Sequence, residues 1–377
     1  MADSYWLEEP GPKLVSKPLS GRADVEIVGA GTTGCSAART LAEAGLRVRV
    51  HDARTVAGGA SGRNGGFALR GGAMAYDRAR EWLGAEEARG YWALTERYLE
   101  RLAGAVGDAL RPVGSLRLAA DEEERDELRR EYEALREDGF DAEWREPLQA
   151  PLGRRFPAAM FHPPDASVQP ARMTRRLAAR AIEAGVEIVE RHRVESLDEL
   201  EAERVLVATD GYPSGLLGQL EGLIIPTRGQ MIATEPVPEP LFPYPHYGRH
   251  GFDYWQQVKD GRILAGGFRD ADMTTEFTAE EQTTPTIQRA LEDFLVELVG
   301  RPLEVTQRWA GIFGLVLDFL PVVGAVPGDG RLWVSGGYSG HGNVLAFMCG
   351  DMVAKAMLGK QVPELQLFDP ARLLTPA

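Results

Sequence analysis

The stretch VEIVGAGTTGCSAARTLAEAGLRVRVHDAR, residues 25–54, decides the fold of the chain. It begins with a short apolar β-branched run, turns at a cluster of glycines, continues through an alanine-rich segment at 35–44 and ends in a second apolar strand at 47–50. Strand, glycine turn, helix and strand in this order are typical of a Rossmann-like dinucleotide-binding unit. The sequence therefore predicts a bound nucleotide at the turn.

Three glycines and one acid in this stretch have separate tasks. Gly29 permits the tight turn, Gly31 lets the backbone approach a pyrophosphate, and Gly34 allows the helix to pack on the strand. Asp52 follows eighteen residues after Gly34, where its carboxylate can accept a ribose hydroxyl and would repel a 2′-phosphate. The helix N-terminus offers free N–H groups to the phosphates. A glycine turn that binds nothing is the alternative, and the framing strands and acid argue against it.

Two more glycine-rich segments favour a bound flavin over a nicotinamide carrier. The run TVAGGASGRNGGFALRGG at 55–72 lies where a nucleotide extending from the first turn would continue, although a flexible surface connector has a similar composition. Near the end of the chain, a strand, a glycine turn at 336–342 and a small-residue helix repeat the first pattern. This second helix N-terminus can meet the other end of a long ligand, which nicotinamide dehydrogenases do not need.

Composition limits the remaining possibilities. The 377 residues are enough for two domains, and a net charge of −14 disfavours nucleic acid as a partner. No apolar run reaches about twenty residues, so we expect no membrane span. The N-terminus has no apolar h-region, and Cys35 and Cys349 show no CxxC spacing. We expect a cytoplasmic protein without structural disulfides or a metal site, and the oligomeric state stays open.

Several motifs occur in one order over nearly the whole chain: GAGTTG, the acid Asp52, GASGRNGG, VATDGY, PTRGQ, DGRILAGG, RWAGIFGLVLDFLPVVG and GYSGHGN. Together they resemble the D-amino-acid-oxidase-like FAD-dependent oxidoreductases, a group that contains glycine oxidase, monomeric sarcosine oxidase and gamma-glutamylputrescine oxidase. The segments SYW, GASGRNGG and DYWQQ are most similar to the gamma-glutamylputrescine oxidase branch.

The resemblance implies an α/β (α+β composite) fold, with a Rossmann-like FAD-binding domain built from discontinuous segments and a substrate domain built on a large antiparallel sheet. We expect the FAD-binding domain at 22–72, 152–220 and 310–365, the substrate-binding domain at 73–151 and 221–309, and an N-terminal extension at 1–21.

The resemblance also implies a set of cofactor-binding residues along these motifs. Pyrophosphate and ribose would be held by the first turn and the strand after it, the ribityl chain and ring by the second glycine-rich run, adenine by the backbone near Val194, and the dimethylbenzene and pyrimidine side by the closing turn. The residues are Gly29, Gly31, Thr33, Gly34, Asp52, Ala53, Arg54, Ala60, Ser61, Arg63, Asn64, Gly65, Gly66, Val194, Ala208, Gly337, Gly340, His341, Gly342 and Asn343.

The expected reaction follows from the cofactor. FAD accepts a hydride at N5 from the carbon next to an amine nitrogen, and the resulting imine is hydrolysed. Dioxygen is the expected acceptor that reoxidises the flavin and gives hydrogen peroxide, although Ile263 stands where sarcosine oxidase relatives carry a lysine that assists oxygen. A dehydrogenase that uses another acceptor stays open. Gly311 stands where those relatives attach flavin through a cysteine, so we predict noncovalent FAD.

Two departures from the family concern the substrate. Phe313 replaces the carboxylate-binding arginine of glycine oxidase relatives, and Val344 replaces a lysine of sarcosine oxidase relatives. A buried carboxylate without a cation is unfavourable, so these losses favour a primary or secondary amine such as gamma-glutamylputrescine. An amino acid or N-substituted glycine is the alternative, because Arg228, Arg63 or Arg269 could still bind a carboxylate.

Large aromatic side chains are the remaining candidates for the substrate pocket. They could surround an alkylamine or a cation by face contacts, or they could simply fill the core. With Arg228, the candidate pocket residues are Tyr254, Trp255, Trp309, Phe313 and Tyr338.

Overall fold

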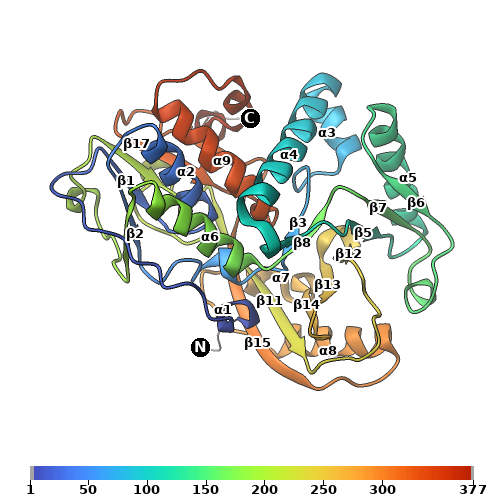
Figure 1. The fold of residues 1–377 in the computed structure, drawn as a ribbon. Helices are drawn as coiled ribbons and strands as arrows, with labels where there is room; N and C mark the ends of the chain where they lie inside the picture. The colour runs from blue at the N-terminus through green and yellow to red at the C-terminus, as the bar shows by residue number, and fades with distance from the viewer. Residues whose placement is uncertain (1–3, 375–377) are drawn as a thin grey trace.

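The computed structural model describes residues 4–374 and confirms the predicted α/β composite, with one six-stranded and one eight-stranded sheet (Figure 1). The helices are α1 (Tyr5–Glu8), α2 (Thr32–Glu43), α3 (Tyr76–Leu83), α4 (Ala85–Val106), α5 (Glu122–Glu137), α6 (Pro170–Glu183), α7 (Met273–Glu276), α8 (Pro285–Val299) and α9 (Gly342–Met357).

The six-stranded sheet carries the dinucleotide motif. Its strands, in spatial order, are β16 (Val322–Ala325), β17 (Leu332–Gly336), β10 (Arg204–Val207), β1 (Val25–Val28), β2 (Val48–Asp52) and β9 (Glu187–Glu190). All neighbours are parallel except β16 and β17. Helix α2 packs against α6 and α9 (Figure 1). The carboxyl ends of β1, β2, β10 and β17 therefore meet at one edge, which is where such folds bind ligands.

Helix α2 begins earlier than the expected segment at 35–44. It runs from Thr32 to Glu43, and Gly31 is its N-cap residue without a side-chain capping bond. The two threonines and Gly34 therefore form the first turn of the helix. The earlier start places this turn directly at the end of β1, where its backbone N–H groups face the edge of the sheet.

The predicted large antiparallel sheet is the eight-stranded one. In spatial order it contains β15 (Val305–Leu315), β11 (Ile225–Thr234), β14 (Ile263–Gly267), β13 (Asp253–Gln257), β12 (His246–Gly248), β5 (Ser115–Leu118), β7 (Ala159–His162) and β6 (Glu143–Arg145). Neighbours are antiparallel except β12 and β5. Helix α8 packs on β11 and β14 and covers an apolar core (Figure 1).

The chain also forms a small third sheet. It is formed by β3 (Phe67–Ala68), β8 (Ala166–Val168) and β4 (Leu110–Arg111). The division of the chain into domains stays a prediction. Strand β7 lies within the segment 152–220 that was expected in the FAD-binding domain, and β15 crosses the expected boundary at residue 310. Both strands nevertheless pair within the eight-stranded sheet. Among residues 4–374, no helix is long and apolar enough to cross a membrane.

Candidate functional site

A cavity of about 390 Å³ is lined by residues from both large sheets. The cofactor-binding candidates that line it are Gly29, Gly31, Thr33, Asp52, Ala53, Arg54, Ala60, Ser61, Arg63, Asn64, Gly65, Val194, Ala208, Gly340, His341, Gly342 and Asn343. The other three candidates do not line the cavity but pack against or hydrogen-bond to its surroundings. Gly34 packs on the first turn, the Gly66 N–H donates to Asn64 Oδ1 at 2.9 Å, and the Gly337 N–H donates to Asp210 Oδ1 at 2.8 Å.

The first glycine turn leaves no room for side chains at two positions. Gly29 has φ of +113°, and an added Cβ would lie 2.5 Å from the carbonyl oxygen of Ala208. A Cβ at Gly34 would lie 1.9 Å from the carbonyl oxygen of Gly29. Glycine is therefore required at Gly34 for helix packing and at Gly29 for the turn, as the motif predicts.

Asp52 lies at the end of β2 with its carboxylate directed to the turn. Oδ2 accepts a hydrogen bond from the Ala30 N–H at 2.7 Å, and Oδ1 accepts one from the Arg54 N–H at 2.7 Å. Burial raises the pKa of Asp52, while these two backbone donors oppose the rise. Each oxygen keeps a further lone pair, so the carboxylate can still accept from a ribose hydroxyl.

The N-terminus of α2 is held close to the second glycine-rich run. The Thr32 N–H donates to Ser61 Oγ at 3.0 Å, and a Cβ on Gly31 would lie 2.9 Å from the same oxygen. Helix α9 also begins at the cavity, with His341 as an N-cap residue that makes no side-chain capping bond. Two helix N-termini and one carboxylate along one cavity suit a dinucleotide with a pyrophosphate.

Two asparagines join the second glycine-rich run to the closing turn. Asn64 Nδ2 donates to Asn343 Oδ1 at 3.2 Å, and Asn343 Nδ2 donates to Asn64 Oδ1 at 3.0 Å and to the Phe67 carbonyl oxygen at 2.8 Å. The N-terminal segment supports this pair, because Trp6 Nε1 donates to the Asn64 carbonyl oxygen at 2.7 Å. This role of Trp6 was not predicted from the sequence. The only sequence feature that pointed to Trp6 was the resemblance of the SYW segment to the gamma-glutamylputrescine oxidase branch.

Asp210 holds the closing turn and was also missed. Its carboxylate accepts from the Gly314 N–H at 3.0 Å and from the Gly337 N–H at 2.8 Å, which connects β15 with the turn after β17. Asp210 has φ of +50°, a backbone conformation that few residues other than glycine, asparagine and aspartate adopt readily. The available signal was an acid at a strand end followed by glycine, within VATDGY.

Two side chains of the closing turn are neutral. Burial lowers the pKa of His341 to about 4, so its imidazole carries no charge at neutral pH. Burial raises the pKa of Tyr338 well above its ordinary value, and its hydroxyl is within hydrogen-bond distance of Thr33 Oγ1 at 2.8 Å and Ser335 Oγ at 3.0 Å. Tyr338 lines the cavity while its polar atom fastens α2 to the turn after β17.

The end of the cavity that we propose for the substrate, here called the substrate end, is formed by the eight-stranded sheet. Tyr254 on β13, Phe313 on β15 and Arg269 after β14 line it together. The ring of Tyr254 lies on glycine backbone, since a Cβ at Gly266 would be 2.4 Å from it. Burial raises the pKa of Tyr254 to about 12, so its hydroxyl keeps its proton.

Arg269 is the half-buried cation of this end. Its guanidinium carbon lies 4.2 Å from the centroid of the Phe252 ring and 5.7 Å from that of Phe313. Burial lowers its pKa. Neither its guanidinium nor the Tyr254 hydroxyl makes a hydrogen bond or ion pair with another side chain or backbone group of residues 4–374. The neighbouring carboxylate, Asp270, is bound to Arg249 at 2.7 Å.

The other two arginines proposed for a carboxylate are engaged by the protein. Arg228 Nε and Nη2 donate to both oxygens of Glu276 at 2.9 and 2.7 Å, and both side chains are buried. Arg63 Nε donates to the Gly58 carbonyl oxygen at 3.0 Å and lies 3.9 Å from Glu281. Of the three, Arg269 is therefore the arginine whose charge the cavity leaves for a ligand.

Two of the candidate aromatic residues lie in the core, which was the alternative role expected for them from the sequence. Trp255 is fully buried and stacks on His246 with ring centroids 5.2 Å apart. Trp309 is 1% exposed and donates through Nε1 to the Arg63 carbonyl oxygen at 2.9 Å. Ile263 and Val344, at the aligned lysine positions, are also completely buried and apolar.

Comparison with known proteins agrees with this geometry. Residues 24–356 match the family described as FAD dependent oxidoreductase, DAO. The chain is 27% identical to the probable oxidoreductase OrdL of Rhizobium meliloti, over 98% of this chain and 91% of that protein. It is 26% identical to gamma-glutamylputrescine oxidoreductase of Escherichia coli, over 89% and 84%. The structure of glycine oxidase from Geobacillus kaustophilus is similar with a TM-score of 0.77 at 24% identity, covering 94% of this chain and 99% of that one.

Proposed function

Because the chain belongs to the DAO family of FAD-dependent oxidoreductases, we propose that it oxidises the C–N bond of a primary or secondary amine that carries an anionic group, such as gamma-glutamylputrescine. The protein binds FAD and acts on amines or amino acids. Bound FAD supplies the two-electron acceptor for the hydride that leaves the carbon next to the nitrogen.

The residues present fit this cofactor. Gly29, Gly31 and the N-terminus of α2 would hold the pyrophosphate, and Asp52 would accept the ribose hydroxyl. The segment from Gly340 to Asn343 would meet the ring system with backbone donors at the start of α9. A Cβ at Gly311 would lie 2.9 Å from Arg63 Cβ, so the position expected for a covalent cysteine is tightly packed. We therefore propose noncovalent FAD, which acid precipitation tests because covalent flavin would stay in the pellet.

Arg269 is the observation that carries the substrate assignment. Arg269 is half-buried between Phe252 and Phe313 and has no carboxylate partner among the described residues 4–374, which is costly, and an anionic ligand group would compensate its charge. The Tyr254 hydroxyl lines the same cavity with its proton available for donation. Both groups would therefore orient the substrate so that its amine end extends toward the closing turn.

Two arrangements of the anionic group are compatible with Arg269. In gamma-glutamylputrescine the carboxylate is far from the oxidised amine, which suits a chain that lacks both family anchors. In an N-substituted glycine the carboxylate is adjacent to the nitrogen, and Arg269 favours this second candidate by lying 5.7 Å from the Phe313 ring, where glycine oxidase relatives carry an arginine.

Anaerobic bleaching of the flavin visible band tests the proposal with gamma-glutamylputrescine, putrescine, sarcosine and glycine. We expect bleaching by gamma-glutamylputrescine at concentrations at which putrescine, which has no anionic group, has little effect. In Arg269→Met the apparent Kd for the anionic amine should rise about ten- to a hundredfold, because a charge-assisted hydrogen bond is lost. The control is Arg301→Met, since Arg301 pairs with Glu239 at the surface.

Each alternative has its own outcome in this experiment. Bleaching by sarcosine or glycine alone would favour the N-substituted glycine or amino-acid oxidase. Equal bleaching by putrescine and gamma-glutamylputrescine, or an unchanged Kd in Arg269→Met, would refute the anionic-group assignment. We further propose dioxygen as the acceptor, which peroxide release during turnover tests; turnover without peroxide would indicate a dehydrogenase.

A further inference from the structure

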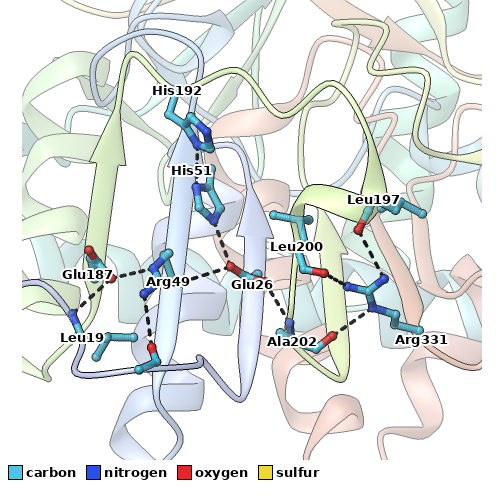
Figure 2. Close-up of polar contacts among 11 residues, drawn as sticks. Leu19, Glu26, Arg49, His51, Glu187, His192, Leu197, Leu200, Ala202 and Arg331 are labelled. Atoms are coloured by element: carbon cyan, nitrogen blue, oxygen red, sulfur yellow. Dashed lines mark hydrogen bonds and ion pairs between the residues drawn. The ribbon is translucent and has the colours of Figure 1, made fainter.

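A chain of polar side chains leads from the interior of the six-stranded sheet to one end of the cavity. Figure 2 shows Glu26 on β1, His51 on β2 and His192 after β9 in one line. His51 Nε2 lies 3.3 Å from Glu26 Oε1, and His51 Nδ1 lies 2.9 Å from His192 Nδ1. Glu26 and His51 are buried, whereas His192 is exposed and lines the cavity.

The proton positions in this chain follow from Glu26. Burial opposes its ionisation, but the Ala202 N–H, which donates at 2.9 Å, and His51 lower the pKa of Glu26 below its ordinary value. A carboxylate can only accept, so His51 Nε2 carries a proton and donates. Burial lowers the pKa of His51, so its imidazole is neutral and its Nδ1 is an acceptor.

His192 must then donate to His51. Two Nδ1 atoms at 2.9 Å can share only one proton, and His51 has none at this atom. His192 therefore carries its proton on Nδ1, and a neutral His192 presents a lone pair at Nε2. The buried pair thus fixes the tautomer of an exposed histidine, as second partners commonly do for functional histidines.

The position of His192 in the cavity indicates which ligand group can donate to its Nε2 lone pair. The backbone N–H of His192 donates to the Asp52 carbonyl oxygen at 2.8 Å, and His51, His192 and Val194 line the cavity beside Asp52. If Asp52 accepts the ribose hydroxyl, the base attached to that ribose lies at this end. Adenine has one exocyclic donor, its 6-amino group, and only an acceptor can pair with it.

We propose that His192 accepts a hydrogen bond through Nε2 from the 6-amino group of the FAD adenine. His51 is a positioning residue that holds the required tautomer through Glu26. His51 lies on β2 and His192 follows β9, so this contact adds a side chain that recognises the base to an end of the cavity where the backbone near Val194 is expected to meet adenine.

The test compares the affinity of the apoprotein for FAD and for the same dinucleotide with unsubstituted purine in place of adenine. Quenching of flavin fluorescence at pH 8 gives both Kd values, at a pH above the ordinary pKa of histidine. We expect the native chain to bind FAD about three- to tenfold more tightly than the purine analogue, the effect of one hydrogen bond. In His192→Phe the two Kd values should become equal, and in His51→Phe the preference should shrink.

The control variant is Arg193→Gln, because Arg193 lines the same end but pairs with Glu195 at the surface. Arg193→Gln should raise the Kd values for both dinucleotides by the same factor, so the preference for adenine should remain. His192 is exposed, so its substitution leaves the core intact, and the native chain alone already tests the preference. Equal affinities in the native chain, or an unchanged preference in His192→Phe or His51→Phe, would overturn the proposal. A protein that binds neither dinucleotide would instead contradict the assignment of FAD.

Discussion

At the cavity edge of the six-stranded sheet, two carboxylates accept hydrogen bonds from backbone N–H groups of turns, whereas a buried arginine of the eight-stranded sheet pairs with a carboxylate side chain. Asp52 binds the Ala30 N–H, and Asp210 binds the Gly337 N–H. Arg228 instead binds Glu276 on a separate helix. A carboxylate held by backbone keeps its place as long as the turn does, while a buried ion pair depends on a second side chain from another element.

We propose that this difference separates cofactor recognition from substrate recognition. The cofactor end depends on turn geometry, which glycines fix locally, so related chains can share it. The substrate end depends on which charged side chains are paired within the protein. Arg269 differs from Arg228 because the carboxylate next to it in the chain, Asp270, is bound to Arg249 instead. The charge of Arg269 therefore stays available to a ligand.

The largest effect on stability is expected for Arg228→Ala. The substitution leaves Glu276, with a side chain only 1% exposed, as an uncompensated buried charge. We expect the free energy of unfolding to fall by about 3–5 kcal/mol, measured by urea denaturation. Substrate affinity of the folded variant should stay unchanged, because Arg228 is bound to the protein.

Arg308→Ala is the matched control, since Arg308 pairs with Glu292 at the surface with side chains 37% and 42% exposed. Such a pair contributes less than about 1 kcal/mol. A weaker substrate affinity in Arg228→Ala together with near-native stability would show that Arg228 binds substrate, and the comparison of the two sheets would fail.

The next effect concerns Gly34→Ala at the cofactor end. Its Cβ would lie 1.9 Å from the Gly29 carbonyl oxygen, which is backbone and cannot rotate away. We expect a loss of about 1–3 kcal/mol, seen as weaker FAD binding by about ten- to a hundredfold in flavin fluorescence quenching. Gly90→Ala in α4 is the control, because no described atom outside the adjoining helix backbone lies within 4 Å of its Cβ, and alanine favours a helix. Native affinity in Gly34→Ala would mean that turn geometry does not control the cofactor end.

The cofactor end could be predicted because its determinants are close together in sequence. The glycine turn, the helix after it and Asp52 lie within one stretch of thirty residues, and their spacing alone places them at one edge of a sheet. Helix α2 differed from the expected segment only in starting at Thr32. Asp210 was missed because its two partners, Gly314 and Gly337, are about a hundred or more residues away.

The substrate end could not be predicted to the same extent. Tyr254 and Trp255 are adjacent on β13, so their side chains point to opposite faces, and only one of them can line the cavity. The alternation of side chains along a strand shows that one of the two faces the cavity, but it does not show which one. The structure places Tyr254 at the cavity and Trp255 in the core. Equally, composition does not reveal that Glu276 is bound to Arg228, while Arg269 pairs with no carboxylate in the part of the chain that the structure describes.

A smaller, pH-dependent effect is expected for His246→Phe in the core of the eight-stranded sheet. His246 is fully buried against Trp255, and burial lowers its pKa to about 3 although hydrogen bonding to the Tyr244 backbone opposes this fall. The folded pKa lies below the unfolded value of about 6.5, so the native chain loses stability as the pH falls below that value. Between pH 7.5 and 5.5 the variant should gain about 1.4 kcal/mol relative to the native chain.

Urea denaturation of both proteins at the two pH values checks this difference. His250→Phe is the control, since His250 is an exposed histidine and its removal should not change the pH dependence through burial. Parallel pH profiles for the native chain and His246→Phe would show that burial in the eight-stranded sheet does not lower the pKa of His246.

The smallest effect is expected for Asn343→Ala at the junction between the second glycine-rich run and the closing turn. The substitution removes the donors to Asn64 Oδ1 at 3.0 Å and to the Phe67 carbonyl oxygen at 2.8 Å. Asn64 keeps its own bonds to the Ala60 carbonyl oxygen and the Gly66 N–H, so the turn geometry should survive and the loss should be about 1 kcal/mol. Thermal unfolding with and without FAD measures it, and Asn343→Asp tests the donor separately, because it keeps the shape but cannot donate. A loss as large as that of Arg228→Ala would mean that side-chain pairing, rather than backbone geometry, holds both ends of the cavity.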